Sequence, residues 1–445
     1  MMSALVKLPR YEAYKDSGIE WLGEIPEHWD LVPIRSIFKF RNEKNDPIKT
    51  NEVLSLSIAN GVTRYSEERR SGNKRKDDLS AYKIAHSGDI VMNSMNVIVG
   101  AVGMSQYYGA ISPVYYALYS DSTDILISFY EQIFQNEGFQ RGLLKFGKGI
   151  LIKLSGRGKL NTIRMKISQN DLKVLYFPKP PKHEQITIAN FLDKKTAQLD
   201  EAIAIKEQQI SLLKEHKQIT IQQAVTQGIN PDVTMRDSGV DWIGQIPEHW
   251  EVKRIKHLAI IQNGQIDPKK KQHKNKILIA PNHIESNTGQ ILYKETAIEQ
   301  SAESGKYPTK KGALLYSKIR PELRKSCIAE EDGMCSADMY SIMPHANLNP
   351  QFMLLIFLGE KFNGYMVSQS LRVAMPKVNR NDVSNYWITI PPIQEQLDII
   401  NKISTLTNKI QSAINLQNQQ IQKLKEYKTT LINSAVTGKI KIPQN

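Results

Sequence analysis

The chain has 445 residues, 40% of them hydrophobic, which predicts two to four domains with buried cores. No apolar run reaches the roughly 18 residues that cross a bilayer, and residues 1–10 lack a signal-peptide core, so we expect a soluble, cytoplasmic protein. Only two cysteines occur, Cys327 and Cys335, without a Cys-x-x-Cys pair. A disulfide framework or a structural zinc site is therefore not expected.

The formal net charge of +14 is concentrated in two blocks of the chain. Residues 30–182 hold 23 Lys and Arg against 14 Asp and Glu, and residues 251–392 hold 20 against 13. The remaining residues hold 16 against 18, which leaves that part slightly acidic. Because a surface that neutralises phosphates gains affinity by releasing counterions, two basic blocks favour two nucleic-acid contacts, although a basic composition alone also fits simple solubility.

A short segment near the start of the chain is repeated. Residues 16–29 return as residues 237–250 with ten of fourteen positions identical and the other four conservatively exchanged. This repeat predicts a tandem duplication of a unit of about 210–220 residues. The domain boundaries that follow are a segment at 1–29, a globular domain at 30–179, a helix at 180–228, the repeated segment at 229–250, a second globular domain at 251–390, a second helix at 391–438 and a tail at 439–445.

The globular segments 30–179 and 251–390 differ from each other in detail and have the pattern of mixed α/β domains. Short β-branched and aromatic runs predict strands at 89–92 and 114–119 in the first segment and at 312–316 and 386–390 in the second. Each segment also contains one predicted helix, at 128–144 and at 350–367. Gly88 precedes an apolar strand in the first segment as Gly312 does in the second, and Ser112 corresponds in the same way to Ser336.

Each globular segment is followed by a polar stretch in which apolar residues recur at alternating steps of four and three, which is the seam of a coiled coil. The predicted helix-pairing residues are Leu192, Leu199, Ile203, Ile210 and Leu213 in the first stretch and Ile403, Ile410, Ile414, Ile421, Leu424 and Leu431 in the second. A Pro-Pro pair precedes each stretch, and Gly228 and Gly438 follow them. The pattern predicts two helices of about 40 residues, each roughly 60 Å long.

This order of segments resembles the specificity subunits of type I restriction-modification systems. The resemblance covers nearly the whole chain and rests on the Trp-x-Gly-x-Ile-Pro-x-His-Trp segments that end at Trp29 and Trp250. It also rests on the Pro-Pro-x-x-Glu-Gln segments that end at Gln185 and Gln396. It implies an α+β fold with two mixed α/β target-recognition domains, separated by two long antiparallel coiled-coil helices in a pseudo-two-fold tandem repeat.

The resemblance further implies that each domain reads one half of a bipartite double-stranded DNA target and that the helices set the spacer. Two methylation subunits would dock on the helices, and a restriction subunit would join the full complex. S-adenosylmethionine, ATP and Mg²⁺ are expected in those partner subunits, with no cofactor and no metal in this chain. We therefore expect a non-catalytic subunit with no catalytic residues of its own.

The candidate DNA contacts are cations and amides that can reach phosphates and base edges. In the first domain the glycine-containing segment before the helix offers Lys148, Lys153, Arg157, Lys159, Asn161 and Arg164. A second cluster there, which fits either a backbone contact or a solvated loop, contains Arg69, Arg70, Lys74 and Arg75. In the second domain the corresponding candidates are Lys318, Arg320, Arg324, Lys325, Arg372, Lys377, Asn379 and Arg380.

Several other patterns favour structure over chemistry. Residues 142–149 approach a Walker A loop, but Gly149 stands where Ser or Thr would bind magnesium, and the glycines follow a predicted helix. The repeated tryptophans could stack on bases, yet identical residues in two different readers favour domain-to-helix docking, with His28 and His249 packing or capping beside them. A coiled-coil scaffold explains the heptads but not two basic domains, and a self-sufficient DNA-processing enzyme needs a catalytic cluster, which we do not find in the sequence.

Overall fold

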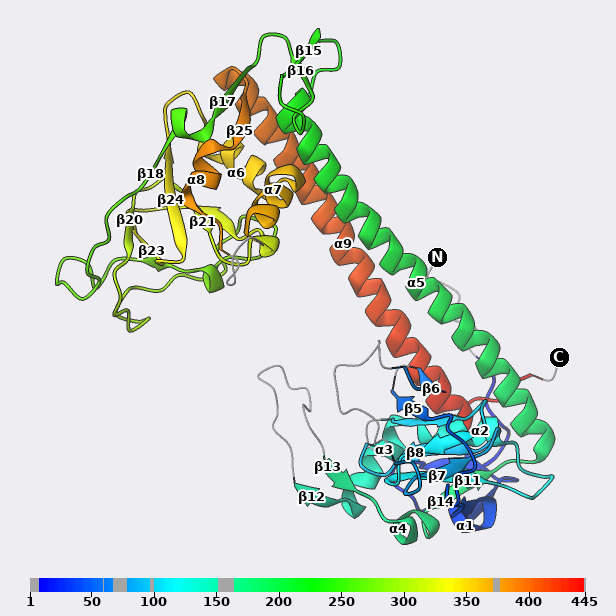
Figure 1. Ribbon diagram of the computed structural model, residues 1–445. Helices are drawn as coiled ribbons and strands as arrows, with labels where there is room; N and C mark the ends of the chain where they lie inside the picture. Colours follow the sequence, from blue (N-terminus) through cyan, green and yellow to red (C-terminus); the bar gives the residue numbers. More distant parts are fainter. Residues whose placement is uncertain are drawn as a thin grey trace. The chain divides into compact units, whose positions relative to one another are not determined.

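The structure is a computed structural model that describes residues 8–58, 60–66, 78–96, 100–150, 164–370 and 377–443, with residues 148–150, 164 and 165 described as backbone only. The chain forms two compact units, residues 1–205 with 419–445 and residues 206–418. The boundaries fall inside the two long helices, α5 (Lys182–Gln227) and α9 (Ile393–Val436). Each unit therefore contains one globular domain and about half of each helix (Figure 1).

A four-stranded antiparallel sheet lies at the centre of unit 1. Its order is β4 (Lys39–Arg41), β11 (Tyr115–Tyr119), β8 (Ile90–Asn93) and β9 (Val102–Met104). Two helices follow, α2 (Ile127–Phe134) and α3 (Glu137–Leu143). The other elements are β1 (Tyr14–Asp16), β2 (Glu24–Pro26), β3 (Asp30–Pro33), α1 (Ile34–Ile37), β5 (Leu54–Ser57), β6 (Gly61–Arg64), β7 (Lys83–Ala85), β10 (Gly109–Ile111), η3 (Leu144–Phe146), β12 (Lys148–Ile150), β13 (Arg164–Lys166), α4 (Gln169–Lys173) and β14 (Tyr176–Lys179).

Unit 2 has a sheet of the same design. Its order is β18 (Ala259–Ile261), β24 (Met339–Pro344), β21 (Leu314–Ser317) and β22 (Ser326–Ile328). The helices that follow are α6 (Pro350–Leu358) and α7 (Glu360–Ser370). The other elements are β15 (Met235–Asp237), β16 (Gln245–Pro247), β17 (Glu251–Arg254), η4 (Ile255–His257), β19 (Leu278–Ile279), η5 (Pro281–His283), β20 (Tyr307–Thr309), η6 (Pro321–Leu323), β23 (Gly333–Cys335), α8 (Arg380–Asn385) and β25 (Trp387–Ile390).

The two domains are more alike than their sequences suggest. In each sheet the strand that comes last in the chain, β11 or β24, lies second in the sheet, between the strands that come first and second in the chain. Gly88 and Gly312 occupy equivalent turns, with φ values of 89° and 85° that only glycine adopts without strain. Ser112 and Ser336 are equivalent too, because the carbonyl of each accepts from the backbone three residues later. The expectation that the domains differ in detail therefore holds for their side chains and not for their topology.

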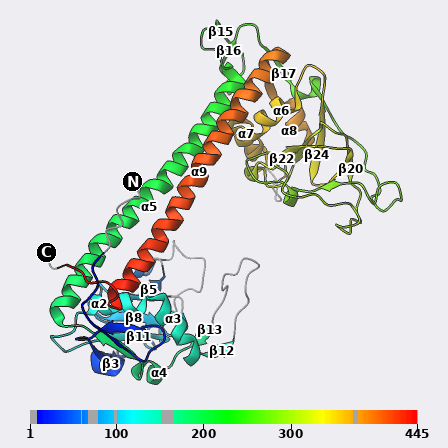
Figure 2. The ribbon, with the colours of Figure 1, turned by 180° about the vertical axis from the view of Figure 1, so that it is seen from behind.

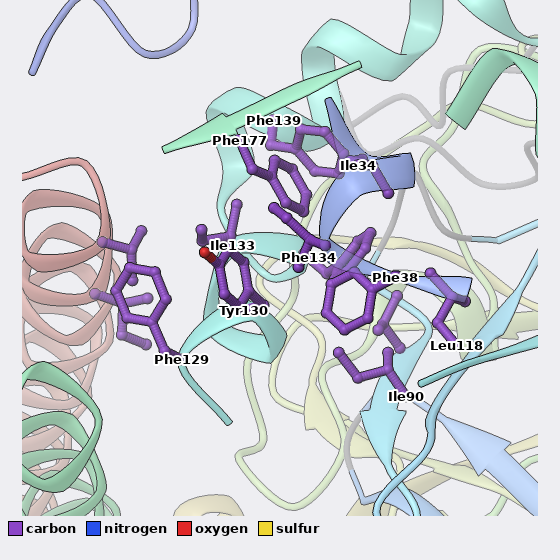
Figure 3. Close-up of a cluster of buried hydrophobic side chains, with 14 of the residues drawn as sticks. Ile34, Phe38, Ile90, Leu118, Phe129, Tyr130, Ile133, Phe134, Phe139 and Phe177 are labelled. Carbon is purple, nitrogen blue, oxygen red and sulfur yellow. The ribbon is translucent and has the colours of Figure 1, made fainter. Parts of the chain in front are cut away.

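The core of unit 1 is aromatic and joins the sheet to the helices. Phe129, Tyr130, Ile133 and Phe134 recur at helical spacing on α2 and are fully buried. Phe134 and Phe139 pack on the Phe177 ring at centroid distances of 5.1 and 5.0 Å (Figure 3). The same cluster includes buried residues of both long helices, so the globular domain and its helix segments share one core. Burying each such side chain contributes about 1.5–3 kcal/mol.

The predicted strands and helices are present, with one correction. Strands β8, β11, β21 and β25 fall in the predicted runs. The two predicted helices, at 128–144 and 350–367, are each a pair of shorter helices. In unit 1 the break is made by Asn136, whose side chain accepts a hydrogen bond from the Phe139 amide and so starts a new helix. In unit 2 the chain breaks at Gly359, which leaves the helical conformation.

The long helices pair along the predicted stripe. Every predicted helix-pairing residue is buried or half-buried, and Leu199, Leu213 and Leu424 are the half-buried ones. In unit 2 the Lys206 ammonium donates to Gln417 at 3.1 Å, and Lys402 donates to the carbonyl of Ile229 at 3.3 Å. Higher residue numbers at the α5 side therefore meet lower residue numbers in α9, so the two segments run antiparallel. They lie side by side in both views (Figures 1 and 2).

Candidate nucleic-acid interface and helix clasp

Several predicted DNA-contacting residues lie outside the part of the chain that the structure describes. They are Arg69, Arg70, Lys74, Arg75, Lys153, Arg157, Lys159, Asn161 and Arg372. Lys148 and Arg164 are described as backbone, and they belong to strands β12 and β13, which pair antiparallel with Lys148 opposite Lys166. The cationic segment 151–163 thus begins and ends at one short hairpin stem.

The stem in unit 1 is fixed to the sheet by backbone contacts. The Ile167 amide donates to the carbonyl of Ser94 at 3.0 Å, and the Tyr116 hydroxyl donates to the carbonyl of Ile167 at the same distance. Ser94 is fully buried and its hydroxyl donates to Val114 at 2.7 Å. Because these partners lie on the central sheet, the stem has a defined position against the core.

Unit 2 repeats this attachment at the corresponding position. The Val378 amide donates to the carbonyl of Lys318 at 2.8 Å, and the Tyr340 hydroxyl donates to the carbonyl of Val378 at 3.0 Å. Ile319 forms an antiparallel bridge with Lys377. Tyr340 therefore has the role of Tyr116, and the chain that returns from residues 371–376 is attached as the hairpin stem is in unit 1.

The predicted cations of unit 2 include three half-buried side chains that bind groups within the unit. The Arg324 guanidinium contacts Gln218, the carbonyl of Leu358 and the carboxylate of Glu360. Lys325 donates to the carbonyl of Pro281 at 2.6 Å, and Arg380 donates to the carbonyls of Ile261 and Gln262. These side chains hold segments of the domain together.

The remaining predicted residues of unit 2 are Arg320, Lys377, Asn379 and Lys318. Arg320 and Lys377 are exposed, and Arg320 has a left-handed backbone with φ of 51°. Asn379 caps α8 reciprocally with Asp382, which is a structural role. Lys318 is 93% buried, since only 7% of its surface is exposed. Exposure alone therefore leaves Arg320 and Lys377 as the cations most available to a ligand.

The repeated His-Trp segments bind the start of each long helix. We call this group the clasp: His28, Trp29 and Glu184 in unit 1, and His249, Trp250 and Glu395 in unit 2. Glu184 accepts hydrogen bonds from Trp29 Nε1 at 3.0 Å and His28 Nε2 at 2.6 Å. Glu395 accepts from Trp250 Nε1 at 2.8 Å and His249 Nε2 at 2.6 Å.

The clasp also contacts the end of the other helix. Gly438, which follows α9, lies against Pro26 and the Trp29 ring, and Gly228, which follows α5, lies against Pro247 and the Trp250 ring. Both glycines have positive φ, 72° and 80°, as helix C-caps require. Trp29 and Trp250 are 0% and 1% exposed. These contacts place Trp29 and Trp250 between domain and helix, as predicted for the repeated tryptophans. The other two repeated tryptophans pack on rings of their own domain, Trp21 on Phe139 and Phe177 and Trp242 on Tyr365 and Tyr386.

One clasp has an extra hydrogen bond. The Tyr11 hydroxyl donates to Glu184 at 2.7 Å. Burial raises the pKa of Glu184, but the hydrogen bonds from Tyr11, His28 and Trp29 together outweigh it, and the net pKa is lowered. Burial, followed by the hydrogen bond to Glu184, raises the pKa of Tyr11. Glu184 therefore stays an acceptor at neutral pH.

Gln185 and Gln396 lie one residue further along and are fully buried. The Gln185 amide donates to the carbonyls of Pro180 and Asp124 at 2.8 and 3.0 Å, and its oxygen accepts from the Leu126 amide at 2.9 Å. Gln396 makes the matching contacts with Pro391, Asn347 and Asn349 at 2.8, 2.9 and 2.8 Å. Each glutamine thus ties the start of a long helix to the loop before α2 or α6.

Comparisons with known proteins agree with this geometry. Residues 247–426 match the family model described as the type I restriction modification DNA specificity domain. The chain is 31% identical over 274 residues to the type I restriction enzyme EcoDI specificity subunit of Escherichia coli, and the alignment covers 58% of this chain and 61% of that protein. Over these regions the chain is similar to the specificity subunits of type I restriction-modification systems.

Other specificity subunits extend the likeness over most of the chain. The MjaVIII specificity subunit of Methanocaldococcus jannaschii is 21% identical over 444 residues, 94% of each chain. A solved chain from work on complex assembly and conformational transition of the type I system superposes with a TM-score of 0.68 at 12% identity, covering 93% of this chain and 98% of its own. The HsdS subunit of Thermoanaerobacter tengcongensis gives 0.53 at 13% identity, covering 94% and 98%. These structures share the fold.

The sequence contained a signal for the clasp, although the motif did not show which groups these residues bind. Glu184 and Gln185 recur as Glu395 and Gln396 after 211 residues, so their presence in both copies marked them, but nothing local indicated which groups they bind. Tyr11 carried no such signal, because it precedes the repeated segment.

Two further observations concern metal binding and membrane crossing. Within the described ranges, no three His, Cys, Asp or Glu side chains are grouped as metal ligands would be, and no helix has the length and apolar character to cross a bilayer. Cys327 and Cys335 are buried free thiols, and burial raises the pKa of each to about 12.

Proposed function

We propose that this chain is the DNA-recognition subunit of a type I restriction-modification complex, and that each globular domain reads one half of a bipartite target. The observation that carries the proposal is that the two domains share one sheet topology but carry different attached segments. The sheets have the same strand order, yet the segments attached beside Tyr116 and Tyr340 differ in length and sequence. A common scaffold with divergent attached segments is what two readers of different half-sites need.

The charge distribution supports a nucleic-acid ligand for both domains. Each basic block coincides with one globular domain, whereas the helices and repeated segments are slightly acidic overall. The segments that differ between the two domains, residues 151–163 and 371–376, are called the variable segments. Phosphate contacts supply most of the sequence-independent affinity, and base contacts from the variable segments would supply the discrimination. The cationic segment 151–163 and the exposed Arg320 and Lys377 are the groups we assign to these contacts.

We further propose that the paired helices set the spacer between the half-sites and carry two methylation subunits, with the two domains related by a pseudo-two-fold axis. The clasp supports this assignment, because its residues are the same in both copies and attach each domain to the start of one helix and the end of the other. The chain itself is non-catalytic in this scheme. The S-adenosylmethionine, ATP and Mg²⁺ would be held by the methylation and restriction subunits.

Mapping methylated adenines in DNA from cells that carry the complex tests the proposal. We expect a bipartite motif with an unread gap. Replacing residues 251–390 with the matching segment of another family member should change one half of the motif and keep the other half. A change in both halves, or methylation by the purified chain without partners, would contradict the proposal.

Helix length offers a second test. Seven residues inserted into both helices, between Ile205 and Lys206 and between Asn418 and Gln419, add about 10 Å of helix. At about 3.4 Å per base pair, the gap should grow by about three base pairs with both halves intact. An insertion of four residues is the matched control, since it breaks the seam register and should abolish methylation instead of shifting the gap.

A further inference from the structure

Each domain places a lysine ammonium over the tyrosine that anchors its variable segment. In unit 1 the Lys83 ammonium lies 5.3 Å from the centre of the Tyr116 ring and donates to the carbonyl of Tyr115 at 2.9 Å. In unit 2 the Lys318 ammonium lies 5.2 Å from the Tyr340 ring and 5.7 Å from the Tyr307 ring. Both tyrosine hydroxyls donate to the strand that leaves the variable segment.

The two lysines reach this place from unrelated positions. Lys83 lies on β7, and Lys318 follows β21. The residue of unit 1 that matches Lys318 is Ser94, since each offers its carbonyl to the chain returning from the variable segment. Both domains therefore have a lysine ammonium over the equivalent tyrosine ring, although the lysine comes from a different position in each. A feature retained between two domains that read different sequences fits a ligand group that does not depend on sequence.

A second lysine lies beside each of the first. Lys166 ends strand β13 and Lys377 bridges to Ile319, and both are exposed. Burial, and then the nearby charge of Lys166, lowers the pKa of Lys83. Burial, and then the charge of Lys377, lowers the pKa of Lys318, while Asp338 and Cys335 act in the opposite direction. Lys166 directly precedes Ile167, and Lys377 directly precedes Val378, the two residues whose carbonyls accept from Tyr116 and Tyr340. Each exposed lysine is therefore next in the chain to the residue held by the tyrosine whose ring carries the inner lysine.

We propose that each lysine pair, Lys83 with Lys166 and Lys318 with Lys377, binds one backbone phosphate of the DNA. This inference rests on the proposed function. A phosphodiester anion between the two ammonium groups would relieve their repulsion, and the tyrosine ring would hold the inner lysine in place. Because the pair lies where the variable segment joins the sheet, the bound phosphate would fix the position of that segment along the duplex.

The salt dependence of binding measures this contact. The chain is reconstituted with its methylation subunits, and its affinity for a duplex with the mapped target is followed by fluorescence anisotropy at several KCl concentrations. The variants are Lys83→Gln with Lys166→Gln and Lys318→Gln with Lys377→Gln. The control is Lys39→Gln with Lys49→Gln, lysines that are already paired with Asp121 and Glu43 at 2.5 and 2.7 Å.

The slope of log K against log salt is negative, and losing one phosphate contact should make it less negative by about 0.9 for each lysine pair, with the control unchanged. With one neutral methylphosphonate at the contacted position of the duplex, wild-type binding should weaken and binding by the matching double variant should not change. The exposed single variants Lys166→Gln and Lys377→Gln guard against misfolding, and each should also make the slope less negative.

Two results would overturn different statements. If the wild-type complex binds the target and both double variants keep its slope, the lysine assignment is wrong while the proposed function stands. If the wild-type complex shows no preference for its mapped target, the proposed function itself is wrong.

Discussion

Removing the carboxylate of Glu184 should destabilise the start of α5 more than removing that of Glu395 destabilises the start of α9. The two clasps share their His and Trp donors, but only Glu184 also accepts from Tyr11. The Glu184 side chain is 16% exposed and that of Glu395 is 41% exposed. The two substitutions, at Glu184 and at Glu395, therefore compare two nearly identical sites within the same chain.

The magnitude follows from the bonds lost. A hydrogen bond to a charged group contributes about 1.5–3 kcal/mol, and the half-exposed histidine pairs add about 0–1 kcal/mol. Glu184→Ala loses the bonds from Trp29 and Tyr11 and the histidine pair, and should cost about 3–7 kcal/mol. Glu395→Ala loses the bond from Trp250 and the histidine pair, and should cost about 1.5–4 kcal/mol. In both variants the indole N–H is left without its acceptor.

Hydrogen exchange read by mass spectrometry resolves the two sites. Peptides over residues 182–195 and 393–406 report local opening at the start of each helix. Tyr11→Phe should cost about 1.5 kcal/mol in the wild type and almost nothing in the Glu184→Ala background, which isolates the extra bond. Equal losses in the two clasps, or an additive effect of Tyr11→Phe, would refute the reasoning.

Three further predictions concern the helix starts and ends. Gln185→Leu keeps the volume but takes the side-chain partner from three backbone groups, one buried and two partly buried, so urea unfolding should show a loss of about 3 kcal/mol. Gly438→Ala should lower the melting temperature more than Gly228→Ala, because both need a left-handed backbone but only at Gly438 would the new Cβ also overlap Pro26. The pKa of Glu184 is lowered by folding, so its stabilisation is present above the unfolded-state pKa and lost as pH falls through the lowered value; Glu184→Gln should flatten this decline in urea midpoint.

The long helices could be predicted almost to the residue because their signals are local. The four-three spacing, the Pro-Pro pairs and the terminal glycines each act within one or two turns. The breaks at Asn136 and Gly359 were missed, because apolar residues continue on both sides and a capping side chain decides where one helix ends. The shared sheet order was missed as well, since strand pairing joins residues distant in sequence and tolerates any apolar residue that fits the pleat.

The candidate contacts show a similar division. That basic residues gather in the two domains is visible in the sequence, but the role of each one depends on distant partners. Arg324 and Lys325 form part of one basic cluster, yet carbonyls of Leu358 and Pro281 bind them. The sequence patterns did not predict a role for Lys83, because a single lysine next to apolar residues belongs to no motif. Only the fold brings it to Tyr116.

The clasp residues and the variable segments have separate roles, and they differ in whether the two copies of the repeat are identical. The clasp residues are the same in both copies, and each clasp contacts the start of one helix and the end of the other within its own unit. The geometry of domain and helix is therefore encoded by residues that take no part in the variable segments. The variable segments are in turn attached through backbone groups and one tyrosine hydroxyl, which constrain few side chains. Because the two sets of residues do not overlap, a variable segment can change its sequence without a compensating change at the clasp. Under the proposed function, one domain can therefore be exchanged while the other keeps its half-site.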